Sequence, residues 1–84
     1  METRVLDGNA IGGLLLELFG TELTAAPCVC AGCGAREELA RLDVYVDCPG
    51  VVVRCRHCGD VMLTIVQGRA RTWVDLGGTR GLEL

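Results

Sequence analysis

The chain has 84 residues, of which 50% are hydrophobic, and a formal net charge of −3. Such a composition excludes a disordered acidic tail, and such a length gives one domain, residues 1–84, whose modest core needs a metal or disulfide to supplement it. The excess of acidic residues disfavours generic binding to phosphate backbones, which requires many Lys and Arg residues.

Residues 1–20 are predicted to form a helical segment. Asp7 is a suitable N-cap, and Gly20 is a suitable C-terminal stop. Apolar residues recur at helical spacing at Ile11, Leu14, Leu15 and Leu18. Gly12 and Gly13 each cost about 1 kcal/mol of helix propensity relative to Ala, so the helix needs tertiary packing. We expect it to cover the sheet that follows; the alternative is a surface for a partner or for self-association.

The rest of the chain is predicted to form strands. Residues 21–27 read as a linker or a short strand. Four strand candidates then follow at residues 41–47, 51–53, 61–66 and 71–76. In the first of them Leu42, Val44 and Val46 alternate with polar residues, and Pro49-Gly50 suits a type II turn to the second. The tail, residues 77–84, contains three glycines and is expected to be irregular.

The strongest signal is a repeated cysteine motif. It reads Cys30-Ala31-Gly32-Cys33-Gly34 and again Cys55-Arg56-His57-Cys58-Gly59. Two residues between paired cysteines let one tight turn present both sulfurs to one ion, and zinc prefers four soft ligands in a tetrahedron. The glycine after each second cysteine permits a positive φ. The hairpin predicted between the motifs would bring them together, so Cys30, Cys33, Cys55 and Cys58 are predicted to bind one Zn²⁺ per chain.

Two cysteines and one histidine lie outside this predicted set. Cys28 lies two residues before Cys30 and could compete with it as a ligand, although only Cys30–Cys33 repeats the spacing of Cys55–Cys58. Cys48 is expected at the hairpin tip, roughly 20 Å from the metal at about 3.3 Å per strand residue. His57 is expected to face solvent beside Arg56, because four sulfurs already complete the metal's shell.

Three functional classes follow from the predicted site. Four cysteines close the coordination shell, so we expect a non-catalytic protein rather than an enzyme. Rubredoxin, an electron carrier, holds iron with similar paired knuckles, but the few aromatic residues here favour zinc over iron. A nucleic-acid-binding ribbon remains an alternative if Arg54, Arg56, Arg69 and Arg71 cluster on one face. Trp73 is expected to lie in the core or on a sheet face.

Several of these segments resemble one known family. They are Leu6-Asp7-Gly8-Asn9-Ala10, the paired knuckles, the segment from Tyr45 to Cys55, and Arg71-Thr72-Trp73-Val74-Asp75-Leu76. Together they resemble a family of small bacterial proteins that is catalogued as a domain of unknown function. The resemblance implies an accessory role beside flavin- or molybdopterin-dependent oxidoreductases. It also implies that the four knuckle cysteines are the matching ligands and that Cys28 and Cys48 are peculiar to this sequence.

The fold expected is therefore small α+β, with an N-terminal helix and a rubredoxin-like zinc ribbon over residues 28–76, an antiparallel sheet of about four strands. The function expected is that of a protein-interaction or assembly module with a protein partner, and a homodimer through the N-terminal helix is a further expectation. The sequence begins without a signal-peptide pattern, and its apolar stretches are too short to span a bilayer. A cytoplasmic location is therefore expected, and in that compartment six cysteines in a short chain indicate metal before disulfides.

Overall fold

The computed structural model describes residues 4–47 and 50–83. Over these residues the chain forms one α-helix, two 3₁₀ turns and eight strands. In chain order they are β1 (Arg4–Asp7), η1 (Gly8–Ile11), α1 (Gly12–Phe19), β2 (Pro27–Cys30), β3 (Arg36–Glu38), η2 (Leu39–Arg41), β4 (Asp43–Asp47), β5 (Gly50–Arg54), β6 (Val61–Gln67), β7 (Thr72–Asp75) and β8 (Thr79–Leu82).

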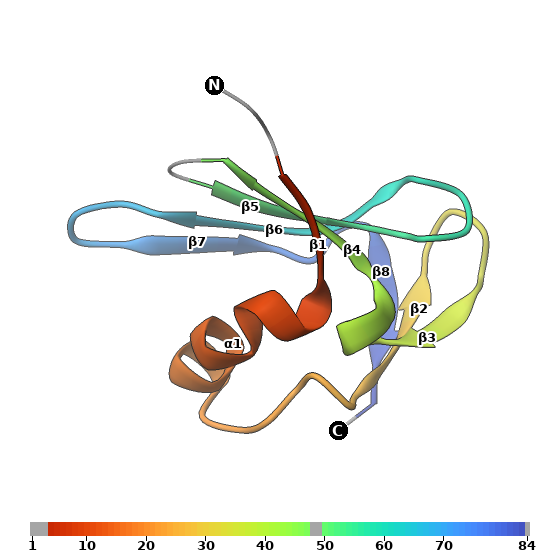
Figure 1. Cartoon of the computed structure of the whole chain (residues 1–84), viewed down its shortest axis with the longest axis horizontal. Helices are drawn as coiled ribbons and strands as arrows, with labels where there is room; N and C mark the ends of the chain where they lie inside the picture. The colour runs from red at the N-terminus through yellow and green to blue at the C-terminus, as the bar shows by residue number, and fades with distance from the viewer. Residues whose placement is uncertain (1–3, 48–49, 84) are drawn as a thin grey trace.

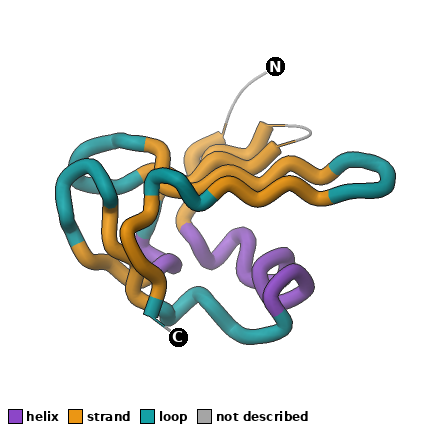
Figure 2. Tube along the Cα trace, turned by 180° about the vertical axis from the view of Figure 1, so that it is seen from behind, coloured by secondary structure: helices purple, strands orange, loops and turns teal. Residues whose placement is uncertain are grey.

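The strands form two antiparallel sheets. The larger sheet has the order β1-β4-β5-β6-β7, and the smaller one has the order β3-β2-β8. Figure 1 shows α1 on one face of the larger sheet, and Figure 2 shows the smaller sheet standing across its end. The predicted α+β class is confirmed. The four predicted strands are β4 to β7, and the expected total of about four was too low because β1 and the whole smaller sheet were missed.

Strand alternation gives the larger sheet one buried face. Cross-strand neighbours Val44, Val53 and Leu63 are 0%, 0% and 5% exposed. The predicted alternation in β4 holds for Leu42 and Val44, whereas Val46 is 40% exposed because it lies towards the far end of the strand. β4 pairs with β5 as an antiparallel neighbour. The turn predicted between them at Pro49-Gly50 is not described, because Pro49 and its neighbour Cys48 lie outside the described residues.

In the described part of the predicted helical segment, residues 1–20, the chain is helical only from Gly8 to Phe19, because Arg4–Asp7 pairs with β4 as strand β1. The helical part packs on the buried face, as expected. The Asp7 carboxylate accepts a hydrogen bond from the Asn9 N–H at 3.1 Å, and this N-cap begins a 3₁₀ turn before α1. Ile11 and Leu15 are 5% and 0% exposed in the shared core. The helix ends where the Gly20 N–H donates to the Leu16 carbonyl at 2.8 Å. Among the described residues, no helix has the length and apolarity needed to cross a membrane.

Thr79–Leu82 of the C-terminal tail form strand β8, which corrects the prediction of an irregular segment. β8 pairs with β2 through Cys28↔Leu82 and Val29↔Gly81, beyond the span 28–76 expected for the ribbon. Before β8, Gly78 lies so close to the Val61 and Met62 backbone that a Cβ there would overlap it. The strand Thr-Arg-Gly-Leu lacks apolar alternation, so the free edge of β2, rather than local propensity, determines its conformation.

Candidate metal centre

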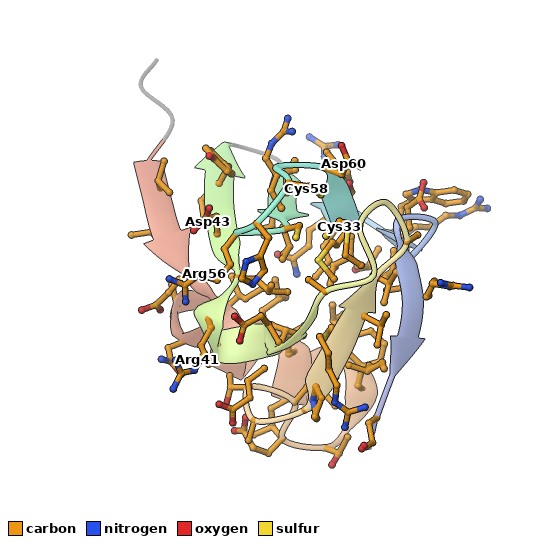
Figure 3. The ribbon with its side chains drawn as sticks, turned by 90° about the vertical axis from the view of Figure 1, so that its right-hand side faces the viewer. Cys33, Arg41, Asp43, Arg56, Cys58 and Asp60 are labelled. Carbon is orange, nitrogen blue, oxygen red and sulfur yellow. The ribbon has the colours of Figure 1, made fainter. Side chains whose placement is uncertain are left out.

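Each of the two sheets supplies one half of a four-cysteine cluster. The first knuckle, residues 30–34, is the loop between β2 and β3 in the smaller sheet. The second, residues 55–59, joins β5 to β6 in the larger sheet. Figure 3 shows Cys33 and Cys58 side by side where the two loops meet. The chain segment between the knuckles contains the β4–β5 hairpin, as the sequence predicted.

The two knuckles have the same backbone hydrogen bonds. In the first, Cys30 N–H donates to the Ala35 carbonyl and Gly34 N–H donates to the Cys30 carbonyl, both at 2.9 Å. In the second, Cys55 N–H donates to Asp60 and Gly59 N–H donates to Cys55, again at 2.9 Å. Gly34 and Gly59 have φ of 76° and 81°, which a residue with a Cβ rarely adopts. The repeated sequence therefore gives a repeated conformation.

Backbone N–H groups in both knuckles point at sulfur. The Gly32 N–H lies 3.3 Å from Cys30 Sγ, and the His57 N–H lies 3.4 Å from Cys55 Sγ. Burial opposes ionisation of Cys55. Hydrogen bonds from the Cys58 and His57 backbone, together with those from the Cys33 and Cys58 thiols, outweigh it and lower the pKa of Cys55 to about 7. Such donors stabilise thiolates, which are the form that binds metals.

The four sulfurs have the spacing of a tetrahedral thiolate site. Cys30 Sγ lies 3.6 Å from Cys58 Sγ, Cys33 Sγ lies 3.6 Å from Cys55 Sγ, and all four atoms lie within 4.8 Å of one another. A metal–sulfur bond of about 2.3 Å in a regular tetrahedron gives sulfurs about 3.8 Å apart, whereas a disulfide needs about 2.05 Å. The four cysteines are free thiols in this structure, and their arrangement suggests a bound metal ion.

The crowding of thiols also indicates a cation. The backbone hydrogen bond from Asp60 lowers the pKa of Cys58, but burial and the neighbouring Cys30, Cys33 and Cys55 thiols raise it to about 12. Four thiolates this close would repel one another strongly, and a divalent ion removes that repulsion. Cys30 and Cys55 are buried at 0% and 2% exposure, whereas Cys33 and Cys58 are exposed. The inner half of the site is thus part of the core.

Cys28 belongs to the core rather than to the cluster. Its side chain is 2% exposed, and its Sγ lies 3.7 Å from the Ala26 carbonyl. Burial raises the pKa of this thiol to about 11. It packs in the apolar core, and the cluster formed by the described residues does not include it. The preference for Cys30 over Cys28, made on spacing alone, agrees with this arrangement.

His57 and Arg54, beside the second knuckle, have polar partners of their own. His57 Nε2 lies 3.0 Å from Glu37 Oε2, a contact between the second knuckle and β3 that no sequence signal indicated. Arg54 donates to the Gly59 carbonyl at 2.9 Å and lies over the Tyr45 ring. Arg56 is exposed beside the acidic Asp43 in Figure 3.

The four arginines considered for nucleic-acid binding do not form one cluster, because they lie at opposite ends of the larger sheet. Arg54 and Arg56 lie at the knuckle end of the larger sheet, before β6 begins. Arg69 and Arg71 lie in the turn after β6 ends. The seven residues of β6 separate the two pairs by roughly 20 Å at about 3.3 Å per residue.

Sequence reasoning also missed a support of the first knuckle. The Ala31 N–H donates to the Gly78 carbonyl at 3.0 Å, so the segment before β8 holds the knuckle from outside. The sequence signal that could have indicated this contact is Gly77-Gly78, because a close approach of two backbone segments often requires glycine.

Comparison with known proteins gives one match. The model of DUF6510, a family of unknown function, matches residues 1–84. No curated protein and no solved structure matches the chain significantly.

Proposed function

Because the chain belongs to DUF6510, a family of unknown function, we propose a function from its site: a non-catalytic, zinc-stabilised ribbon that acts as a protein-interaction or assembly module. The observation that carries the proposal is the set of four sulfurs within 4.8 Å of one another, presented by two matching knuckles. Structural zinc sites have this closed four-ligand shell, whereas catalytic zinc keeps a position for water or substrate.

Zinc is proposed over iron from the surroundings of the cluster. Both metals accept four thiolates, so the ligands alone do not choose between them. The three aromatic residues of the chain are Phe19, Tyr45 and Trp73, at the end of α1, on β4 and on β7 respectively. Rubredoxin-like electron carriers, by contrast, carry aromatic residues around the metal. This contrast supports a structural ion rather than an electron carrier.

An exposed apolar surface supports the interaction part of the proposal. The outer face of the larger sheet, which we define as Val5, Tyr45, Val52, Val66 and Trp73, points away from α1 (Figure 1). Two of these five residues, on the two edge strands of the sheet, are well exposed: Trp73 at 68% and Val5 at 58%. Exposed apolar patches mark interaction sites, and Trp is enriched among the residues that dominate binding energy.

The charges on the outer face favour a protein over a nucleic acid. Asp43 and Asp75 share this side of the sheet, by their pairing with Arg54 and Thr64. Arg54 is already bound to the Gly59 carbonyl. Carboxylates beside an apolar surface repel a phosphate backbone but suit an apolar protein surface with a few basic groups.

The location and pathway are the least direct parts of the proposal. Thiolate ligands must stay reduced before they bind metal, which supports a cytoplasmic location. A role beside a flavin- or molybdopterin-dependent oxidoreductase rests on the family resemblance alone.

Elemental analysis with an absorption spectrum tests the metal. We expect one zinc per chain and no visible absorption in freshly purified protein. Iron with thiolate-to-iron absorption bands would instead support the electron carrier, and a metal-free folded protein would overturn both proposals.

The surface is tested with a matched pair of variants. A photoreactive residue at position 73 should crosslink a protein partner in cells, whereas one at Leu16, 49% exposed on α1, should not. Trp73→Ser should abolish co-purification of that partner, and Leu16→Ser should leave it unchanged. The reverse pattern, with crosslinks between two copies through Leu16, would favour a homodimer through the helix over the outer face. Tight binding of the purified protein to DNA or RNA at physiological salt would contradict the proposal.

A further inference from the structure

A small apolar cavity lies between α1 and the smaller sheet, away from the cysteine cluster. Its volume is about 110 Å³, and six leucines and Phe19 line it together with Cys28, Thr79 and Gly81. Leu15 and Leu39, at 0% and 1% exposed, form its interior. Phe19 and Leu76, at 40% and 43% exposed, lie at the surface, so the cavity has an opening between the end of α1 and the segment before β8.

The polar groups that line the cavity are engaged elsewhere. Thr79 Oγ1 donates to the Met62 carbonyl at 2.9 Å, and the Cys28 thiol lies 3.7 Å from the Ala26 carbonyl. Among the described residues, no buried side-chain nitrogen or oxygen lacks a partner. A buried water needs two to four polar partners, roughly, and apolar cavities without them stay dry. Water therefore gains little by entering this space.

The size and lining define the chemistry that fits. An engineered apolar cavity of about 150 Å³ in another protein binds benzene or xenon. The cavity here is somewhat smaller, has an opening, and has no charged residue among its described lining residues. Drug-sized ligands and nucleotides need about 300 Å³ or more and several placed polar groups, so they do not fit.

We propose that this cavity is a binding site for an uncharged apolar molecule of about the size of one aromatic ring, entering between Phe19 and Leu76. Methyl groups of buried leucines would surround the ring, and the sulfur of Cys28 would lie against it, a contact that aromatic rings favour. The site is separate from the outer face, and it does not depend on which macromolecule that face binds.

The cavity also depends on the cysteine cluster. β2 supplies Cys28 to its wall and continues directly into Cys30 of the first knuckle. β8 supplies Thr79 and Gly81 to the wall, and β8 pairs with β2 as an antiparallel neighbour in the smaller sheet. Both walls therefore require the smaller sheet to be in place, so the ligand should bind only to metal-loaded protein.

Benzene titration followed by the methyl NMR spectrum of the metal-loaded protein tests the proposal. Shifts should saturate and should be confined to leucines that line the cavity, and benzoate should bind at least about tenfold more weakly because its charge would lose its hydration. Xenon should shift the same methyl groups. Shifts that do not saturate, that spread over surface methyl groups, or that benzoate reproduces equally would overturn the site.

Cavity-filling variants locate the binding. Leu23→Phe adds atoms to the lining and should weaken benzene binding at least about tenfold, whereas Leu16→Phe adds the same atoms outside the cavity and should change it less than about twofold. If Leu23→Phe does not fold, Leu76→Phe at the exposed opening provides the same test. Equal binding by a lining variant and the Leu16 control would show that benzene binds elsewhere.

Discussion

Removing the metal should unfold the smaller sheet and, with it, most of the domain. The four sulfurs connect the β2–β3 loop to the β5–β6 loop, and two of the cysteines, Cys30 and Cys55, are core residues. Structural zinc contributes about 10–16 kcal/mol of apparent binding free energy, and a domain's whole stability is about 5–15 kcal/mol. Even a loss of about 5 kcal/mol lowers the Tm of a domain of this size by about 20–40 °C.

The assay is thermal unfolding by far-ultraviolet circular dichroism, before and after chelation in the presence of a reductant. The Tm should fall by at least about 20 °C, and zinc should restore it fully at about one equivalent per chain. Amide exchange should speed up first at the Gly34 and Gly59 N–H groups, which close the two knuckles. A chelated protein that keeps its native spectrum and Tm would refute the reasoning.

A pair of serine variants separates loss of the ion from loss of core packing. Cys58→Ser removes a sulfur of the cluster and should lower both the metal content and the Tm. Cys28→Ser leaves the cluster intact, so metal content should stay at one per chain although burial of a hydroxyl lowers stability by about 1–3 kcal/mol. Equal loss of metal from both variants would contradict the assignment of the ligands.

The remaining predictions concern glycines and one thiol. Gly8→Ala should lower the free energy of unfolding, measured with urea, by about 1–3 kcal/mol, because a Cβ would overlap the Leu39 carbonyl. Gly13→Ala, with open space around its Cβ, should raise that free energy by up to about 1 kcal/mol. Equal effects of the two variants would contradict this packing. Gly59→Ala should cost about 1–2 kcal/mol because its φ is 81°, and no loss would mean that the knuckle relaxes. With a pKa of about 11 against 9.0 for the free thiol, Cys28 has about 50-fold less thiolate at pH 9 in native than in unfolded protein. Its alkylation, mapped by mass spectrometry, should be slower by at least about that factor.

The cysteine cluster and four of the five strands of the larger sheet, β4 to β7, could be predicted because their signals are local. Repeated Cys-x-x-Cys-Gly motifs specify their own turns, and β4 to β6 carry apolar residues at strand spacing. The helix was predicted from its N-cap at Asp7 and its stop at Gly20, although its first turn is 3₁₀. In each case the residues that carry the signal are the residues that form the structure.

The smaller sheet could not be predicted because its signal is not local. β3 has the sequence Arg-Glu-Glu and β8 has Thr-Arg-Gly-Leu, and neither shows strand alternation. Both become strands by pairing with β2, whose conformation the first knuckle already fixes. A single sequence read by local propensity therefore omits strands that tertiary pairing creates.

The same non-local pairing explains why the sheets should depend on the ion. β2, β3 and β8 have four, three and four residues, which is too short for an isolated sheet to be stable. Beyond core packing, the connections to the larger sheet include the contact of Gly78 with β6 and the hydrogen bond from Thr79 to Met62. The cysteine cluster adds a further connection at the same end of β2, where Cys30 pairs with Thr79. An ion at that position thus stabilises the part of the fold with the least intrinsic stability, and the apolar cavity lies against that part.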